Sequence, residues 1–389
     1  MLKCRKLTAI LIGILLVVTM VGCGKTSTNT AKDTVKIGLN LELSGAVAEY
    51  GQKGQNGANL AIEDMNKKGG VLGKQVEAIA LDNKSDNAES ASVAASLAQK
   101  GIVGIVGCMT SGRTEAAIPV GLQYKLPMIS PTGTASEVTV DKATNAVRPY
   151  VFRVCFLDPF QGQVMAKFAT DELKVKKAAV LFDSSNDYSK GLAQAFETNF
   201  TAAGGTIVDK EAYIEKDKDF KATLTKIKAA NPEVIFVPGY YNEVGLIVKQ
   251  GRELGITVPF TGGDGWGSPQ LVQIAGAEAL ANTFFCNHFS ASSTDPKVQA
   301  FVQAYKAKYN SEPDGFAALG YDAAALMMDA VQRAGSTDPA KVTEALAATS
   351  GFQGVAGTIT MDKNHNPVKA AVIIGFDNGK EIVKATIKP

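Results

Sequence analysis

The chain has 389 residues, which is more than one ordinary hydrophobic core accommodates and predicts two domains. Its 40 Lys and Arg residues are balanced by 38 Asp and Glu residues, and the formal net charge of +2 argues against a nucleic-acid partner. The cysteines show no C-x-x-C spacing, which argues against a structural zinc site and a disulfide framework. We expect Cys108, Cys155 and Cys286 to be buried thiols in apolar strands.

The N-terminal residues predict export and attachment to a membrane. Residues 1–22 combine a basic start, an apolar run and small residues, which is the pattern of a secretory signal peptide. The run from Met20 to Cys23 resembles the bacterial lipoprotein box, so we expect Cys23 to become a lipid-modified first residue with fatty acyl chains such as palmitate. Residues 23–34 are polar and unpatterned, as in a flexible tether. The alternative is a cleaved signal and a freely secreted protein.

Strands and helices alternate through the rest of the chain, which predicts an α/β fold of mostly parallel sheets flanked by helices. The first strand is expected at 35–43 and the second at 76–82, with a helix between them. The order restarts at 151–158, and the glycine pair that ends a helix at 69–70 recurs at 204–205. This repetition indicates two similar lobes in tandem, although two βαβ units can also resemble each other by chance.

The lobes are predicted to be discontinuous in sequence. The chain after the second lobe is too long to be a tail, so we expect part of it to return to the first lobe. The N-terminal lobe is then expected to contain 35–152 and 284–365, and the C-terminal lobe 153–283 and 366–389. Several crossings between two lobes would form a hinge.

Two neighbouring strand ends, after residues 107 and 130, are candidates for an anion site. The first leads through Ser111 into a helix, and the second is followed by Thr132, Gly133 and Thr134. In an open parallel sheet the strand ends form the ligand crevice, where a helix N-terminus presents free N–H groups and a positive dipole. A carboxylate or a phosphate would fit there. The alternative is an ordinary pair of strand-to-helix turns, which favour Ser, Thr and Gly for conformational reasons.

Candidate cation-binding and aromatic groups lie at other strand ends. Asp264 lies in the run GGDGWG, where we expect it either to cap the helix that opens at Ser268 or to meet a cation. A phosphate-binding loop is the alternative for this run, although it does not match the dinucleotide fingerprint. Tyr188 and Tyr240 follow predicted strands, and Trp266 is the only tryptophan. An anion site on one lobe and a carboxylate with aromatic walls on the other would together bind a zwitterion.

Four blocks of sequence carry a family resemblance. They are residues 37–73, residues 105–139, residues 182–196, and VPGYYNEVGLIVKQGRELG at 237–255 followed by TGGDGWGS. Through these blocks the chain after the tether resembles the substrate-binding lipoproteins of ATP-binding-cassette amino-acid importers, of the leucine/isoleucine/valine-binding type. The resemblance implies a type I periplasmic-binding-protein fold with two α/β lobes, three crossover segments and a ligand in the cleft between the lobes.

The resemblance also implies roles for individual residues. Ser111 and Thr134, with backbone N–H groups near Thr132, would hold the α-carboxylate of an amino acid, and Asp264 would hold its α-ammonium group. The expected ligand-binding set is Tyr50, Ser111, Thr132, Gly133, Thr134, Tyr188, Tyr240, Asp264, Trp266 and Phe316. Two departures from the family pattern are that Cys108 has no evident disulfide partner and that the bulky Trp266 adjoins Asp264, which leaves the preferred ligand side chain open.

We therefore expect a binding protein rather than an enzyme, with no cofactor, no metal and no nucleic-acid partner. It would close around a small amino acid, for which the resemblance implies leucine, isoleucine or valine. It would deliver this ligand to the permease of an ABC transporter, as a monomer held by lipid on the extracellular or periplasmic side of the cell membrane. An amide, urea or an aromatic acid is the alternative ligand. An exported hydrolase using Ser111 or Asp264 is a further alternative, but the sequence has only two histidines and no GxSxG or HExxH motif. A gene regulator of the same fold would need a helix-turn-helix where this chain has its signal segment.

Overall fold

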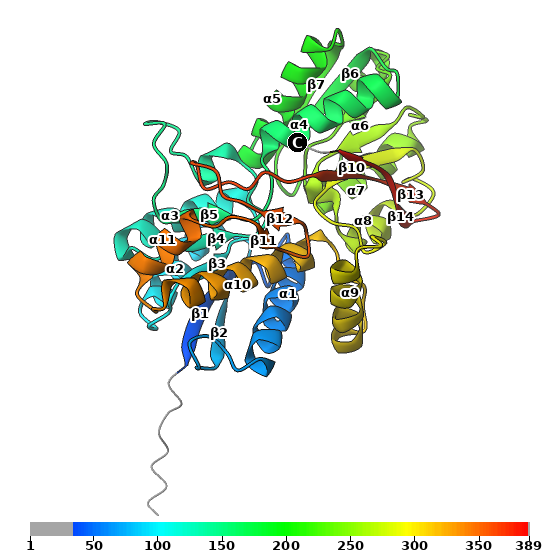
Figure 1. Cartoon of the computed structure of the whole chain (residues 1–389). Helices are drawn as coiled ribbons and strands as arrows, with labels where there is room; N and C mark the ends of the chain where they lie inside the picture. Colours follow the sequence, from blue (N-terminus) through cyan, green and yellow to red (C-terminus); the bar gives the residue numbers. More distant parts are fainter. Residues whose placement is uncertain (1–33, 388–389) are drawn as a thin grey trace, which may run out of the picture. The chain divides into compact units, whose positions relative to one another are not determined.

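Residues 34–387 are described in a computed structural model of the chain (Figure 1). The predicted signal peptide at 1–22, the predicted lipidation site Cys23 and nearly all of the tether at 23–34 lie outside the described residues, so they stay predictions. Among the helices at 34–387, none is both long enough and apolar enough to cross a membrane.

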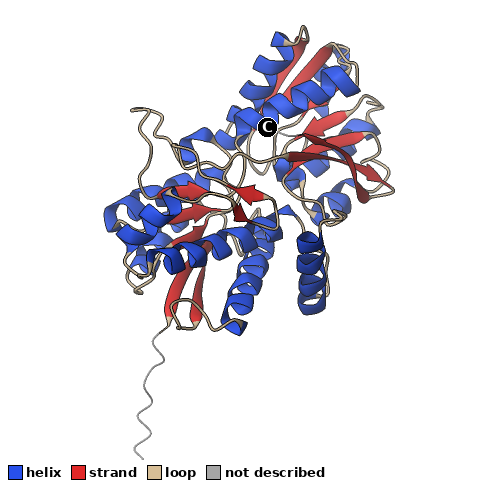
Figure 2. Cartoon of the chain, in the orientation of Figure 1, coloured by secondary structure: helices blue, strands red, loops and turns tan. Residues whose placement is uncertain are grey.

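The first sheet has five parallel strands in the order β2-β1-β3-β4-β5. Their bounds are β1 Val35–Leu41, β2 Val76–Asp82, β3 Ile105–Gly107, β4 Met128–Ser130 and β5 Val151–Arg153. Helices flank the strands (Figure 2), and the inner strands are buried almost throughout. This explains why these strands are continuous apolar runs rather than alternating ones.

The helices on the first sheet come from two separate parts of the chain. They are α1 Ala48–Lys67, α2 Asn87–Ala98, α3 Ser111–Tyr124 and the short η1 Ser136–Val138, then α9 Pro296–Tyr309, α10 Gly315–Ala334 and α11 Pro339–Ala347, followed by the small hairpin of β11 Phe352–Gln353 and β12 Thr358–Ile359. Helices α1 and α10 pack very closely. Gly57 of α1 permits this approach, since a Cβ at that position would lie 1.9 Å from the carbonyl oxygen of Ala317 on α10. This contact joins the start of the described chain to the segment that returns after the second sheet.

The second sheet has seven strands in the order β14-β13-β10-β9-β8-β6-β7. The bounds are β6 Lys177–Asp183, β7 Thr206–Tyr213, β8 Val234–Phe236, β9 Phe260–Gly262, β10 Thr283–Asn287, β13 Ala371–Asp377 and β14 Lys380–Ile387. Strands β6 to β10 run parallel, whereas β13 and β14 form an antiparallel hairpin at one edge. The turn of this hairpin is Asn378-Gly379, with positive φ angles of 47° and 76° that suit a two-residue hairpin turn.

Five helices and two short helical turns accompany the second sheet. They are α4 Asp158–Lys167 continued by the π-helical turn η2 Phe168–Glu172, then α5 Asp187–Ala202, α6 Lys221–Ala229, α7 Tyr241–Glu253, the 3₁₀ turn η3 Asp264–Trp266 and α8 Pro269–Ala275. The strand predicted at 151–158 ends at Arg153 in the structure. Helix α4 already begins at Asp158, with Pro159 in its first turn, where proline is well tolerated.

The chain crosses between the two sheets three times, as the fold class predicts. The crossings follow β5, β10 and β12. Strand β10 pairs with both β9 and β13, so the whole strand belongs to the second sheet, whereas the sequence placed the lobe boundary between 283 and 284. The predicted α/β architecture of two lobes is confirmed. Cys108, Cys155 and Cys286 are buried free thiols, as expected.

Candidate functional site

A small cavity lies where strand ends of the two sheets meet. All of its wall residues are buried. The first lobe contributes Tyr50, Met109, Thr110, Ser111, Thr132 and Phe316, and the second contributes Tyr188, Tyr240, Asp264 and Gly265. Of the residues predicted to bind a ligand, Gly133, Thr134 and Trp266 do not line this cavity, and the others do. The structure thus brings most of the predicted residues together, from both lobes.

The first lobe presents an uncapped helix N-terminus to the cavity. Helix α3 begins at Ser111, and its N-cap residue Thr110 makes no side-chain capping bond, so the N–H groups of the first turn have no acceptor within the helix. The Ser111 Oγ accepts a hydrogen bond from Ala135 N at 3.1 Å, which leaves its own proton free to donate. The Thr132 hydroxyl is already donated to the carbonyl oxygen of Met109. This wall offers N–H and O–H donors to an anion.

A buried carboxylate fixes the loop that leads into α3. Glu42 lies just after β1 and has no exposed surface. Its Oε2 accepts a hydrogen bond from Met109 N at 3.0 Å, and its Oε1 accepts from Thr110 N at 3.0 Å and from Thr110 Oγ1 at 2.8 Å. Because the Thr110 hydroxyl is occupied in this way, Ser111 supplies the free hydroxyl of this wall.

Gly133 and Thr134 lie behind the wall, next to a buried arginine at the end of β5. The Arg153 guanidinium donates from Nη1 to Gly133 O at 2.7 Å and from Nη2 to Ala135 O at 2.8 Å. Its positive charge therefore lies beneath the loop that follows β4 and favours an anion near that loop. The Thr134 hydroxyl is buried, and its contact with a ligand stays a prediction.

The second lobe presents the carboxylate of Asp264, which is 4% exposed. Its Oδ1 accepts a hydrogen bond from Gln161 Nε2 at 3.2 Å, and its Oδ2 lies 2.9 Å from His288 Nε2. Asp264 does not cap α8, because the Ser268 hydroxyl caps that helix by accepting from Gln270 N at 3.2 Å. The predicted capping role of Asp264 is therefore wrong, and its contact with a cation stays a prediction.

The glycines of the GGDGWG run make room for neighbouring groups. A Cβ on Gly262 would lie 2.1 Å from Trp266 Nε1, and a Cβ on Gly265 would lie 2.7 Å from Gly239 O. The Trp266 indole is fully buried and donates from Nε1 to Val237 O at 2.9 Å. Trp266 therefore packs inside the second lobe and does not narrow the cavity. Close packing, rather than a phosphate-binding loop, accounts for these glycines.

Behind Asp264 lies a buried chain of polar side chains. Gln161 Nε2 also donates to Asp158 Oδ1 at 2.9 Å, and Gln161 Oε1 accepts from Asp264 N at 3.1 Å. Burial raises the pKa of Asp158 well above its ordinary value, and the charge of Asp264 adds to the effect. Burial also lowers the pKa of His288, against the opposing effect of its hydrogen bond to Asp264. At neutral pH, His288 is therefore an uncharged donor to the carboxylate.

Aromatic rings form the apolar part of the cavity. Phe316 stacks on Tyr50 with ring centroids 3.9 Å apart, and Tyr188 stacks on Tyr240 with centroids 5.2 Å apart. The Tyr50 hydroxyl crosses between the lobes and donates to the carbonyl oxygen of Gly265. Burial raises the pKa of Tyr50 well above its ordinary value, so this hydroxyl remains a donor over the whole physiological range.

Further contacts join the lobes at the rim of the cavity. Arg113 Nη2, on α3, lies 2.8 Å from Glu215 Oε1, just after β7. The Tyr241 hydroxyl donates to Ala46 O at 3.2 Å, and the Asn242 amide donates to the same oxygen. These contacts tie the two lobes together beside the cavity.

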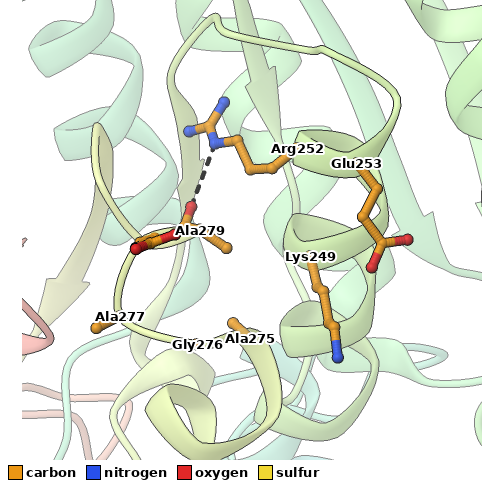
Figure 3. A pocket seen from close by; sticks show the side chains of 8 residues that line it. Lys249, Arg252, Glu253, Ala275, Gly276, Ala277 and Ala279 are labelled. Carbon is orange, nitrogen blue, oxygen red and sulfur yellow. Dashed lines mark hydrogen bonds between the residues drawn. The ribbon is translucent and has the colours of Figure 1, made fainter.

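A larger hollow lies on the surface of the second lobe, between α7 and the segment after α8 (Figure 3). Its empty volume is about 770 Å³, and its wall includes Lys249, Arg252 and Glu253. Arg252 donates to Ala279 O at 3.2 Å and to Val258 O at 2.8 Å, so its guanidinium holds the backbone of the lobe. The wall of this hollow comes from the second lobe alone and has no aromatic side chain.

Comparison with known proteins decides the family. A profile of periplasmic binding proteins matches residues 34–380. The chain belongs to the periplasmic binding protein family. As a member, it is an extracytoplasmic solute-binding protein, which confirms the family and fold class predicted from the sequence.

Several relatives of this periplasmic binding protein have a named ligand. A leucine-, isoleucine-, valine-, threonine- and alanine-binding protein of Pseudomonas aeruginosa is 34% identical over 345 residues, covering 87% of this chain and 89% of the relative. The structure of the branched-chain amino acid transporter substrate-binding protein LivJ of Streptococcus pneumoniae, in complex with isoleucine, matches with a TM-score of 0.85 and 41% identity, covering 92% of this chain and 100% of that one. The leucine-binding protein LivK of Thermotoga maritima matches with a TM-score of 0.86 and 36% identity, covering 92% and 99%.

The sequence analysis missed some of the residues at this site. The cavity is also lined by Met109, Thr110 and Gly265, each of which lies within two residues of the predicted Ser111 or Asp264. Their position at the same strand ends could have identified them from the sequence. Gln161 and His288 gave no such signal, because they lie far from Asp264 in the sequence and only the fold brings them to its carboxylate.

Proposed function

We propose that this periplasmic binding protein captures a branched-chain amino acid between its two lobes and delivers it to the permease of an ATP-binding-cassette importer. The observation that carries the proposal is that one cavity joins the uncapped N-terminus of α3 to Asp264 of the opposite lobe, next to aromatic rings. An α-amino acid with an aliphatic side chain has a matching anion, cation and apolar group.

Each part of the ligand has a candidate partner. The α-carboxylate would accept from the first-turn N–H groups of α3 and from the Ser111 hydroxyl, and the α-ammonium group would donate to Asp264. The aliphatic side chain would lie against Tyr50, Phe316 and Met109. Charge-assisted hydrogen bonds contribute roughly 1.5 to 3 kcal/mol each, and burial of a leucine-sized side chain adds roughly 1.5 to 3 kcal/mol. The ligands named for the relatives include leucine, isoleucine and valine, which supports this assignment.

Binding would be coupled to closure of the lobes rather than to catalysis. The candidate anion donors and Asp264 belong to different lobes, so an amino acid reaches both sets of partners only in the closed form. A ligand that binds the closed form more tightly shifts the equilibrium between open and closed forms towards closure. The contacts of Tyr50 and Arg113 with the second lobe would stabilise the closed form, and their loss would accompany release.

The proposal extends to the part of the chain outside the described residues. Lipid attached at Cys23 would hold the protein on the outer face of the cell membrane, with the residues before 34 as a tether. Two acyl chains suffice for stable anchoring, because each buried methylene contributes roughly 0.8 kcal/mol. The protein would act there as a monomer beside its permease.

Isothermal titration calorimetry with a panel of ligands tests the proposed function. We expect leucine, isoleucine or valine to bind, and amides, urea and aromatic acids to bind more weakly or not at all. Asp264→Ala should abolish amino-acid binding while the protein stays folded by circular dichroism. Asp171→Ala is the matched control, since Asp171 is exposed and its carboxylate contacts only Lys167 and Thr170 at the surface. Tight binding of an amide or an aromatic acid, or unchanged leucine affinity in Asp264→Ala, would contradict the proposal.

A further inference from the structure

His288 stands out among the buried titratable groups that line no cavity wall at the proposed ligand site. It lies immediately after β10, where the chain leaves the second sheet. Its side chain is 2% exposed, and its Nε2 lies 2.9 Å from Asp264 Oδ2. The imidazole stacks on Phe156, which belongs to another crossing segment, with centroids 3.6 Å apart. The ring is therefore fixed by two crossing segments and contacts the carboxylate that faces the cavity.

The surroundings of the ring select one form of the imidazole. A neutral imidazole carries its proton on one nitrogen, and a carboxylate oxygen at 2.9 Å requires that nitrogen to be the donor. The other nitrogen, Nδ1, is buried and has no hydrogen-bond partner. A proton on Nδ1 would leave a buried donor unsatisfied and place two lone pairs against each other at Nε2. The contact is therefore Nε2–H donating to Asp264 Oδ2.

Burial is the main reason that the ring is neutral, and the charged groups that face it act in opposite directions. Burial lowers the pKa of His288, the hydrogen bond and charge of Asp264 raise it, and the ammonium group of Lys369 lowers it again. Lys369 is itself buried and donates to Val154 O at 3.0 Å, so its position is fixed. A neutral imidazole orients Asp264 without cancelling its charge, whereas an imidazolium would compete with any cation in the cavity.

Gln161 holds the same carboxylate from the other side. Its amide donates to Asp264 Oδ1 at 3.2 Å and its carbonyl accepts from Asp264 N at 3.1 Å. Each carboxylate oxygen thus has one neutral donor, and each retains a second lone pair for another donor. The free lone pairs are the ones that a ligand in the cavity can use.

We propose that His288 is a positioning residue for the ligand's amino group: its Nε2–H holds Asp264 so that the free lone pairs of the carboxylate face the cavity. This inference rests on the proposed function, in which Asp264 binds the α-ammonium group. In metal sites, removing a side chain that orients a ligand of the metal changes affinity by roughly 10- to 100-fold, and we expect an effect at the lower end of that range here.

The test compares two ligands that differ only in the amino group. Leucine and 4-methylpentanoate share the carboxylate and the aliphatic chain, so the ratio of their affinities measures what the amino group contributes. His288→Leu should lower that ratio at least 10-fold by weakening leucine binding, with little change for 4-methylpentanoate. His288→Gln, which can still donate from Nε2, should restore the ratio to within a few fold of the wild type. Equal weakening of both ligands, or an unchanged ratio, would overturn the inference.

A second measurement does not depend on any ligand and separates this inference from the proposed function. The chain has only two histidines, so ¹⁵N NMR of the imidazoles can be assigned by comparison with a His365→Gln variant. We expect His288 to carry its proton on Nε2 and to be neutral at pH 7 and above, because burial lowers the pKa of its imidazole. An Nδ1–H tautomer or an imidazolium would refute the positioning role even if leucine binds. Failure of the wild type to bind any amino acid, with the Nε2–H tautomer present, would instead refute the proposed function.

Discussion

The ion pair at the rim of the cavity gives a direct test of lobe closure. Arg113 belongs to α3 of the first lobe and Glu215 follows β7 of the second, and their side chains meet at 2.8 Å. Arg113 is 5% exposed and also donates to Ser85 O from Nε at 3.1 Å and from Nη2 at 2.7 Å, so it is held on the first lobe whether or not the lobes are closed. Glu215→Gln therefore changes only the contact between the lobes.

The size of the effect follows from the type of bond that is lost. Glutamine keeps an oxygen that can accept from Arg113 but removes the negative charge. A charge-assisted hydrogen bond contributes roughly 1.5 to 3 kcal/mol and a neutral one roughly 0.5 to 1.5 kcal/mol, so the closed form should lose about 1 kcal/mol. That difference corresponds to a roughly fivefold weaker affinity for the amino acid. Most of the change should be in the dissociation rate, because the pair forms only after the lobes close.

Stopped-flow fluorescence and calorimetry at low and high salt would measure this effect. The difference between wild type and Glu215→Gln should shrink as salt rises, since screening weakens the wild-type pair. Glu211→Gln is the matched control, because Glu211 pairs with Lys226 within the second lobe. Equal affinities and equal dissociation rates of wild type and Glu215→Gln at low salt would refute the assignment of this pair to closure.

Three further predictions concern other groups. Burial and the neighbouring charge of Asp187 raise the pKa of Glu115 from 4.5 to about 7, so Glu115 destabilises the folded protein increasingly as pH rises from about 4.5 to 7. Glu115→Gln should therefore raise the free energy of unfolding at pH 8, by at most ~3 kcal/mol, and leave it unchanged at pH 4, as measured by urea denaturation; a gain at pH 4 as large as at pH 8 would contradict this reasoning. Tyr50→Phe keeps the ring on Phe316 but loses the bond to the second lobe, and should speed leucine release by roughly 3- to 10-fold in stopped-flow experiments; an unchanged rate would remove this hydroxyl from closure. Cys23→Ser should move the protein from the membrane to the soluble fraction on cell fractionation, and persistent membrane association would contradict the lipid anchor.

Local patterns in the sequence were sufficient to predict the fold and most of the residues that line the cavity. Apolar runs and glycine-terminated helices predicted nearly every strand and helix of the two sheets, because buried parallel strands need continuous apolar runs. The Ser111 helix start and Asp264 were found from their places at strand ends, and they line one cavity. Trp266 was expected there because of its sequence position beside Asp264, but η3 turns its indole into the core of the second lobe.

The sequence by itself determined the type of chain this is: two α/β lobes, with a candidate anion site at one set of strand ends and a carboxylate at the other. Those features are local, since each depends on a few consecutive residues and on the period of their apolar positions. Only the tertiary structure decided which side chains support the carboxylate. Gln161, Asp264 and His288 come from three separate segments, and hydrogen bonds between such segments depend on how the lobe packs. The same is true of the contacts between lobes, because the partners of Tyr50 and Arg113 lie on the other lobe.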